Sequence, residues 1–91
     1  MQILDYNLIL TCQCCPEQYD VFDSDGKQSG YIRLRGGNFR VYYPDTGGEL
    51  VFYHRFEDDA WKGMFDNDEE REKYLTEAVK AIHNHERRQN A

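Results

Sequence analysis

The sequence predicts an α+β fold, with a four- or five-stranded, mainly antiparallel β-meander and one C-terminal α-helix packed on one face. Two alternating runs of residues meet at Gly36-Gly37, which is typical of a β-hairpin with a two-residue turn. Near the C-terminus, apolar residues recur at helical spacing: Leu75, Ala78, Val79 and Ile82. We expect one domain over the 91 residues, with the sheet in 1–56, an acidic aromatic connection in 57–66 and the helix in 67–88.

The hairpin from Gly30 to Tyr43 is the element around which we expect the sheet to form. A turn at Gly36-Gly37 sets the cross-strand pairs: Arg35 with Asn38, Leu34 with Phe39, Arg33 with Arg40, Ile32 with Val41 and Tyr31 with Tyr42. Successive side chains alternate between the two faces of a strand, so the arginines share one face and the apolar residues the other. Like charges opposite each other repel, and the pair of arginines therefore favours an acidic neighbour or an anionic ligand.

Two further strands are expected before this hairpin. Residues 3–12 alternate and place four side chains on one face: Leu4, Tyr6, Leu8 and Leu10. Residues 18–23 form the next strand and end at an Asp25-Gly26 turn. A two-residue turn there pairs Val21 with Gly30 and puts Asp20 beside the arginines, whereas a bulge of one residue would reverse these faces.

The last strand is expected over residues 49–56. Pairing Tyr43 with Glu49 would put Val51 and Tyr53 on the core face, and three side chains beside the arginines: Leu50, Phe52 and His54. The helix that follows is expected to have Asp66 or Asn67 as its N-cap. Glu69 or Glu70 is placed to make the reciprocal hydrogen bond of a capping box.

The acidic composition limits the classes of function that are expected. The chain has 11 Lys and Arg against 17 Asp and Glu, a net charge of −6, which argues against nonspecific binding to nucleic acid or anionic membranes. No run approaches the length of a membrane span, and the N-terminus lacks the basic start of a signal peptide. We therefore expect a cytoplasmic protein.

Three clustered cysteines raise the question of a metal site. Cys12 and Cys15 have the C-x-x-C spacing of a zinc-binding motif. Cys14 and one histidine would complete a zinc site, and the candidate histidines are His54, His83 and His85. A second ligand pair is missing, and residues 83 and 85 point in different directions on a helix. A thioredoxin-like role needs a helix after the motif, where this chain has a proline and a strand. We expect free thiols and no cofactor, with a small zinc-binding protein as an alternative.

No catalytic signature is present. The sequence has no discernible Ser-His-Asp or Cys-His pairing, no phosphate-binding G-x-x-x-x-G-K-[ST] loop and no H-E-x-x-H. The pairs Gly36-Gly37 and Gly47-Gly48 fit hairpin turns better than phosphate loops. We therefore expect a protein that is not an enzyme.

Two surfaces are candidate binding sites. The first is a sheet face of arginines and tyrosines that would hold a nucleotide or another anion: Tyr31, Arg33, Arg35, Arg40 and Tyr42. Its structural alternative is a solvated or subunit-covered face neutralised by Asp20. Because both faces of the sheet carry apolar side chains, we also expect a homodimer or higher oligomer.

The second surface is part of the acidic aromatic connection, and its residues would dock on a basic partner protein: Asp58, Asp59, Trp61, Met64 and Phe65. The structural alternative is that Trp61 and Phe65 fold inward and the acids are solvated.

Three segments, CPEQYDVFD, GYIRLRGGNFRVYYPDTGGE and EEREKYLTEAVKAI, give the chain a resemblance to short uncharacterised proteins of phages and prophages. The resemblance implies an anti-defence role in the host cytoplasm. The leading hypothesis is then a non-enzymatic, phage-type inhibitor that occludes the surface of a host defence protein through the acidic aromatic connection. The alternative is a sponge that sequesters a nucleotide or other anion on the arginine and tyrosine face.

Overall fold

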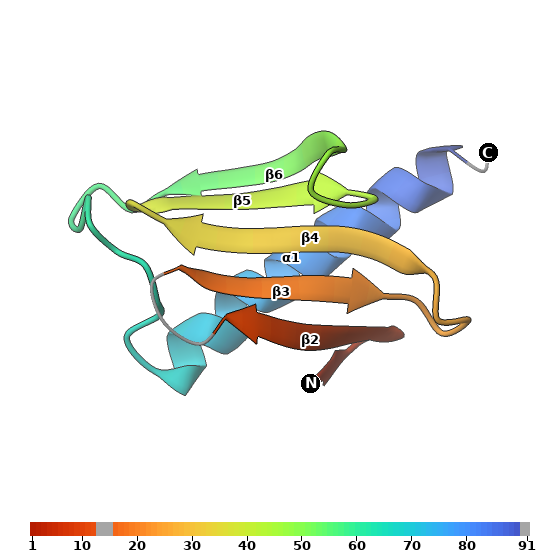
Figure 1. The fold of residues 1–91 in the computed structure, drawn as a ribbon, viewed down its shortest axis with the longest axis horizontal. Coiled ribbons are helices and arrows are strands. Elements are labelled where there is room, and N and C mark those ends of the chain that lie inside the picture. The colour runs from red at the N-terminus through yellow and green to blue at the C-terminus, as the bar shows by residue number, and fades with distance from the viewer. Residues whose placement is uncertain (13–15, 90–91) are drawn as a thin grey trace.

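A six-stranded antiparallel sheet lies against one long helix in the computed structural model of this chain, which describes residues 1–12 and 16–89 (Figure 1). The strands follow one another in the sheet in sequence order, as in a meander. Their bounds are β1 (Gln2–Ile3), β2 (Tyr6–Cys12), β3 (Glu17–Phe22), β4 (Gln28–Arg35), β5 (Asn38–Tyr43) and β6 (Glu49–Arg55). The predicted α+β class is confirmed, with more strands than the four or five expected.

The central hairpin of β4 and β5 has the predicted register at all five pairs, from Arg35 with Asn38 to Tyr31 with Tyr42. Gly36 and Gly37 have φ angles of 57° and 77°, which a primed two-residue turn requires and which a side chain would strain. On the other side of β4, Val21 pairs with Gly30 and Asp20 with Tyr31, so the predicted faces of β3 are also confirmed.

The N-terminal segment is two strands rather than the single strand predicted over 3–12. Leu4 has a φ of 53°, and the turn at this residue folds β1 back so that Ile3 pairs with Tyr6. Tyr6 and Leu8 face the core as expected, but Leu4 and Leu10 are largely exposed. Folding back lets Ile3 pack against the core and gives the edge of β2 a partner.

The predicted faces of β6 were partly wrong. Tyr43 pairs with Glu49 and Tyr42 with Leu50, but Val41 then pairs with Phe52, which leaves Val51 as the extra residue of a β-bulge. Beyond the bulge the faces are reversed: Phe52 and His54 point toward the helix and Tyr53 lies opposite Arg40. Packing of the Phe52 ring edge-on to Phe39, at 5.9 Å, stabilises this arrangement.

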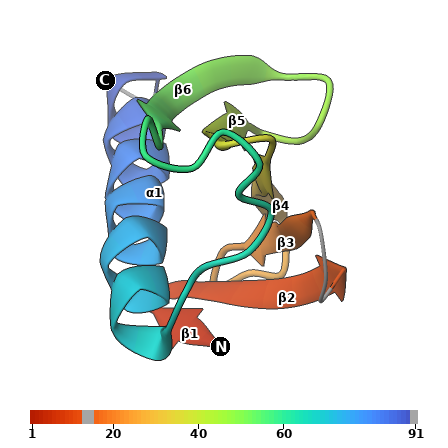
Figure 2. The same cartoon turned by 90° about the vertical axis from the view of Figure 1, so that its left-hand side faces the viewer.

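Helix α1 (Asp68–Gln89) covers one face of the sheet only (Figure 2). Asn67 caps it by accepting a hydrogen bond from the Glu70 amide at 2.8 Å, while the Glu70 carboxylate accepts one from the Asp66 amide. All four predicted core residues of the helix are fully buried: Leu75, Ala78, Val79 and Ile82. Within the described residues, no helix is long and apolar enough to span a membrane.

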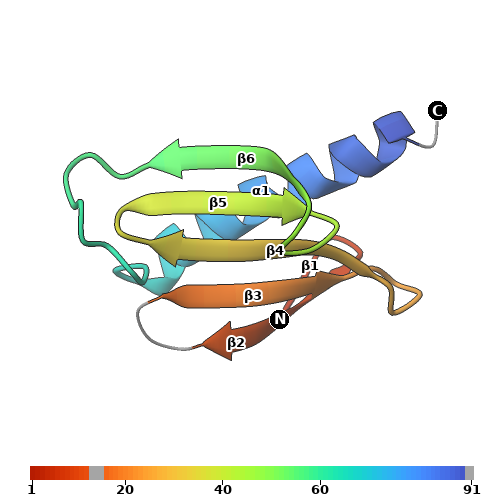
Figure 3. The same cartoon turned by 45° about the horizontal axis from the view of Figure 1, so that its top comes forward.

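The acidic aromatic connection runs along one end of the sheet, from β6 to the start of α1 (Figure 3). Backbone hydrogen bonds attach it there: the Gly37 amide donates to Lys62 and the Glu17 amide donates to Gly63. A Cβ atom at Gly37 would lie 2.8 Å from the Asp59 carbonyl oxygen, so the hairpin turn and the connection are in close contact. The connection is thereby held by the β4–β5 turn and by β3.

Candidate functional site

The face of the sheet turned away from α1, here called the open face, has no helix over it in the described part of the chain (Figures 1 and 2). Residues opposite one another in the register share this face and form three rows. The first row is Ile9, Asp20, Tyr31, Tyr42 and Leu50; the second is Cys12, Gln18, Arg33, Arg40 and Tyr53; the third is Arg35, Asn38 and Arg55.

All three arginines predicted for this face lie on it together, and the β6 bulge adds a fourth, Arg55. Within residues 1–12 and 16–89, none of the four forms an ion pair with a carboxylate. Arg55 donates to the Gly36 carbonyl and to Asn38 Oδ1, at 3.2 and 3.0 Å. Arg40 lies over the Tyr53 ring at 5.5 Å. These contacts of Arg40 and Arg55 are with uncharged groups, so they do not neutralise the two guanidinium groups.

Three tyrosines accompany these arginines. The rings of Tyr31 and Tyr42 are 6.2 Å apart and tilted by 32°, and the Tyr53 hydroxyl donates to Asn38 Oδ1 at 2.6 Å. The Tyr31 hydroxyl donates to Gln18 Oε1. Burial raises the pKa of Tyr31, so its ring stays neutral at physiological pH. The face therefore offers uncharged aromatic rings beside fixed positive charges.

The charge on the molecule is unevenly distributed. Four of the 11 Lys and Arg residues lie in the three rows, with one of the 17 Asp and Glu residues, Asp20. That carboxylate accepts a hydrogen bond from Gln28 Nε2 at 3.2 Å. The open face is thus basic although the whole chain carries a net charge of −6. Sequence reasoning missed Arg55 and Tyr53 as members of this face because it did not place the bulge.

The second predicted surface is only partly assembled. Trp61 is 91% exposed, Met64 is 43% exposed, and Asp58 and Asp59 are also exposed, whereas Phe65 is 3% exposed. Phe65 stacks on Tyr74 at 5.9 Å in the core, where a partner protein would not reach it. The expectation that Phe65 takes part in partner binding is therefore wrong, because its ring fills the gap between the sheet and the start of α1.

Trp61 itself is presented outward by a turn. The Asp59 carboxylate accepts a hydrogen bond from the Trp61 amide at 3.1 Å, and the Asp59 carbonyl accepts one from the Lys62 amide at 3.2 Å. Lys62 points inward, where it is nearly fully buried and pairs with Asp66 and Glu70 at 2.8 and 2.9 Å. Burial opposes its charge, but these hydrogen bonds raise the pKa of Lys62 overall. The inward lysine anchors the turn that leaves the indole in solvent.

A buried carboxylate holds the connection and the helix to the sheet. Glu17 is 2% exposed and accepts hydrogen bonds from Arg71 Nε at 2.7 Å, from the Phe65 amide at 3.1 Å and from the Tyr19 hydroxyl. Burial opposes ionisation, but the donors outweigh it and lower the pKa of Glu17. No sequence signal identified this group, which has a positioning role in the fold.

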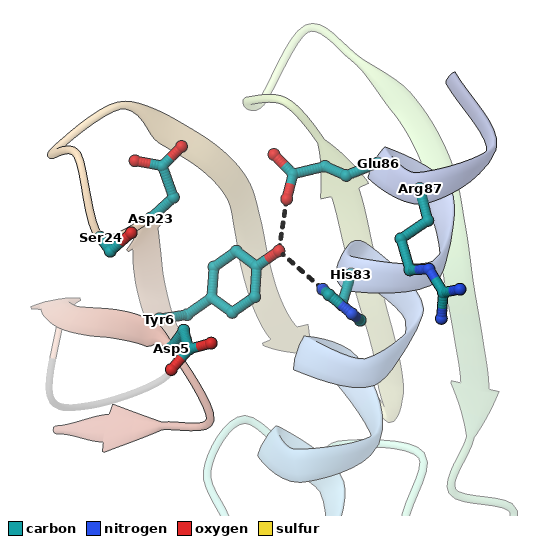
Figure 4. A pocket seen from close by; sticks show the side chains of 7 residues that line it. All are labelled: Asp5, Tyr6, Asp23, Ser24, His83, Glu86 and Arg87. Carbon is teal, nitrogen blue, oxygen red and sulfur yellow. Dashed lines mark hydrogen bonds between the residues drawn. The ribbon is translucent and has the colours of Figure 1, made fainter. Parts of the chain in front are cut away.

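An open pocket of about 400 Å³ lies between α1, the start of β2 and the β3–β4 turn (Figure 4). The Tyr6 hydroxyl donates to Glu86 and lies 3.4 Å from His83 Nδ1, while Ser29 donates to the other Glu86 oxygen at 3.1 Å. Burial and Glu86 raise the pKa of Tyr6, so the phenol stays protonated. These groups satisfy one another, and the cluster is explained as a link between the helix and the sheet.

The candidate zinc ligands are only partly described. Cys14 and Cys15 lie outside the described residues, and Cys12 is half-buried at the end of the second row. The histidines have separate environments: His54 lies beside Tyr74, His83 beside Tyr6 and His85 beside Glu49. Among the described residues, no three metal-binding side chains are grouped together. The expectation of no metal stays a prediction.

Comparisons of the chain with protein-family models, with curated proteins and with solved structures find no match. The resemblance to phage proteins stays an expectation.

Proposed function

We propose that this chain is a non-enzymatic binding protein whose open face holds an anionic ligand of the nucleotide class. The single observation that carries the proposal is the pair Arg33 and Arg40, directly opposite each other with no carboxylate paired to either in the described residues. At about 5 Å in water, two like charges repel by about 1 kcal/mol. A phosphate between the two guanidinium groups would convert that repulsion into charge-assisted hydrogen bonds.

The neighbouring rings support a ligand that carries an aromatic base. Tyr31 and Tyr42 lie in the row next to the paired arginines, so a phosphate held by the arginines would bring an attached base over these rings. Stacking of a base on an aromatic side chain tolerates any base, because each one has a π face. The expected ligand therefore combines phosphate and nucleobase.

Docking of a basic partner protein on the acidic aromatic connection is the second candidate function, and the 91% exposure of Trp61 favours it. In this hypothesis the chain occludes the surface of a host protein, as the phage resemblance implies. We rank it second because Phe65 belongs to the core, while the open face has gained Arg55 and Tyr53. The two candidates use different residues and can be tested separately.

The test of the first candidate is a calorimetric titration with nucleoside mono-, di- and triphosphates, comparing the wild type with Arg33→Ala and Arg40→Ala. Each substitution should weaken binding by about 1.5 to 3 kcal/mol, roughly ten- to a hundredfold, without unfolding the protein. Lys80→Ala is the matched control, because it removes an exposed charge from α1 on the opposite side of the sheet. Equal loss in this control, or no binding to any nucleotide, would contradict the proposal.

A further inference from the structure

The arginines of the open face are spread over three strands and two rows. Arg33 lies on β4 and Arg55 on β6, two strand spacings apart, and Arg55 is also one row further along the strands. With about 4.8 Å between strands and about 7 Å between rows, the two Cα atoms are about 12 Å apart. A ligand that carries several phosphates along its length would contact both arginines without drawing the two side chains together.

The aromatic rings lie beside this line of charge rather than at its end. Tyr31 and Tyr42 occupy the first row, next to Arg33 and Arg40, and Tyr53 occupies the second row between Arg40 and the edge of the sheet. A chain of linked nucleotides would place successive phosphates on the arginines and successive bases on the rings. Sheets that bind RNA stack about two or three bases in this way.

From this arrangement we infer that the natural ligand is a single-stranded nucleic acid lying across β4, β5 and β6. This inference rests on the proposed function and deepens it. A duplex would not use the face, because its bases are stacked on one another and do not offer their π faces to tyrosine rings.

A second copy of the chain is a poorer occupant of the open face. Two open faces brought together would place four arginines from each copy in one interface. One acid on each side, Asp20, would not neutralise them. Charge complementarity therefore selects a polyanion.

The experiment measures fluorescence anisotropy of labelled oligothymidylates of increasing length, with competition by thymidine monophosphate, a DNA duplex and polyglutamate. Affinity should rise with length until the oligonucleotide spans the face and then level off. If four phosphates are contacted, the slope of log affinity against log salt should be about −3. Arg55→Ala should reduce that slope by about 0.7, and Tyr42→Ala should weaken binding about tenfold or more at constant slope.

Two controls make the result specific. Lys80→Ala should leave both affinity and slope unchanged, and circular dichroism should show that each variant keeps the fold. Oligothymidylates that bind no tighter than the monophosphate would overturn the inference while leaving the nucleotide function in place. Equal competition by polyglutamate, or no binding of any nucleotide probe, would overturn both. Equally tight binding of the duplex would overturn the inference of a single strand.

Discussion

At the scale of single residues, Glu17 connects three parts of the molecule. Its carboxylate binds Arg71 of α1, the Phe65 amide of the connection and the Tyr19 hydroxyl of its own strand. Because the group is buried, each lost donor would leave an unsatisfied charge in the core. The Glu17 carboxylate thus adds a side-chain anchor at Phe65 to the backbone hydrogen bonds that hold the connection.

We predict that Glu17→Gln lowers the free energy of unfolding by about 2 to 3 kcal/mol, since the charge-assisted bonds to Arg71 are lost. Urea denaturation measures this change. Glu77→Gln, which neutralises an exposed carboxylate of α1, is the control and should change stability by less than about 0.5 kcal/mol. Equal stability of the two variants would show that the Glu17 contacts contribute nothing.

The ionisation of Glu17 should also affect how the stability of the fold changes at low pH. The pKa of Glu17 in the folded protein is below its ordinary value of 4.5, so the unfolded chain binds this proton more readily. The stabilisation is fully present above pH 4.5 and is lost as the pH falls through the lowered pKa. Denaturation at a series of pH values should show a smaller acid-induced loss in Glu17→Gln than in the wild type. Parallel curves would contradict the assignment.

At the scale of elements, the sequence predicted what local patterns determine. Gly36 and Gly37 sufficed for the register of the central hairpin, and the spacing of Leu75 to Ile82 sufficed for the buried face of α1. The β6 bulge was not predictable in this way, because it depends on which ring packs against Phe39 from a distant part of the chain. The packing of Phe52 against Phe39 places Tyr53 on the open face instead of in the core.

The packing of α1 on β4 gives a prediction at this scale. Gly30 faces the helix, and a Cβ atom there would lie 2.4 Å from Cδ1 of Ile82. Gly30→Ala should therefore destabilise the fold by about 1 to 3 kcal/mol through overpacking. Gly47→Ala is the control, because its new Cβ would meet only the Asp45 carboxylate at 3.6 Å. Thermal unfolding compares the two, and an unchanged melting temperature for Gly30→Ala would mean that the helix is not seated on this residue.

At the scale of the whole molecule, net charge does not describe single surfaces, because composition averages over all of them. A net charge of −6 argued against a nucleic-acid partner, yet four arginines gather on the open face. The hairpin pattern had already placed three of them together. Arg55 could not be added without the bulge, and the burial of Phe65 involves long-range contacts with Glu17 and Phe39. The expected self-association stays a prediction, although Phe52, which supported it, faces the helix.

The most direct test of the open face as the binding site is a two-dimensional NMR titration of the labelled protein with a short oligothymidylate. Chemical-shift changes should concentrate on amides of β4, β5 and β6, including Arg33, Arg40 and Tyr42, while the indole signal of Trp61 and the signals of α1 stay unchanged. Changes centred on Trp61 and its acidic neighbours, with β4 and β5 unaffected, would contradict this placement of the binding site.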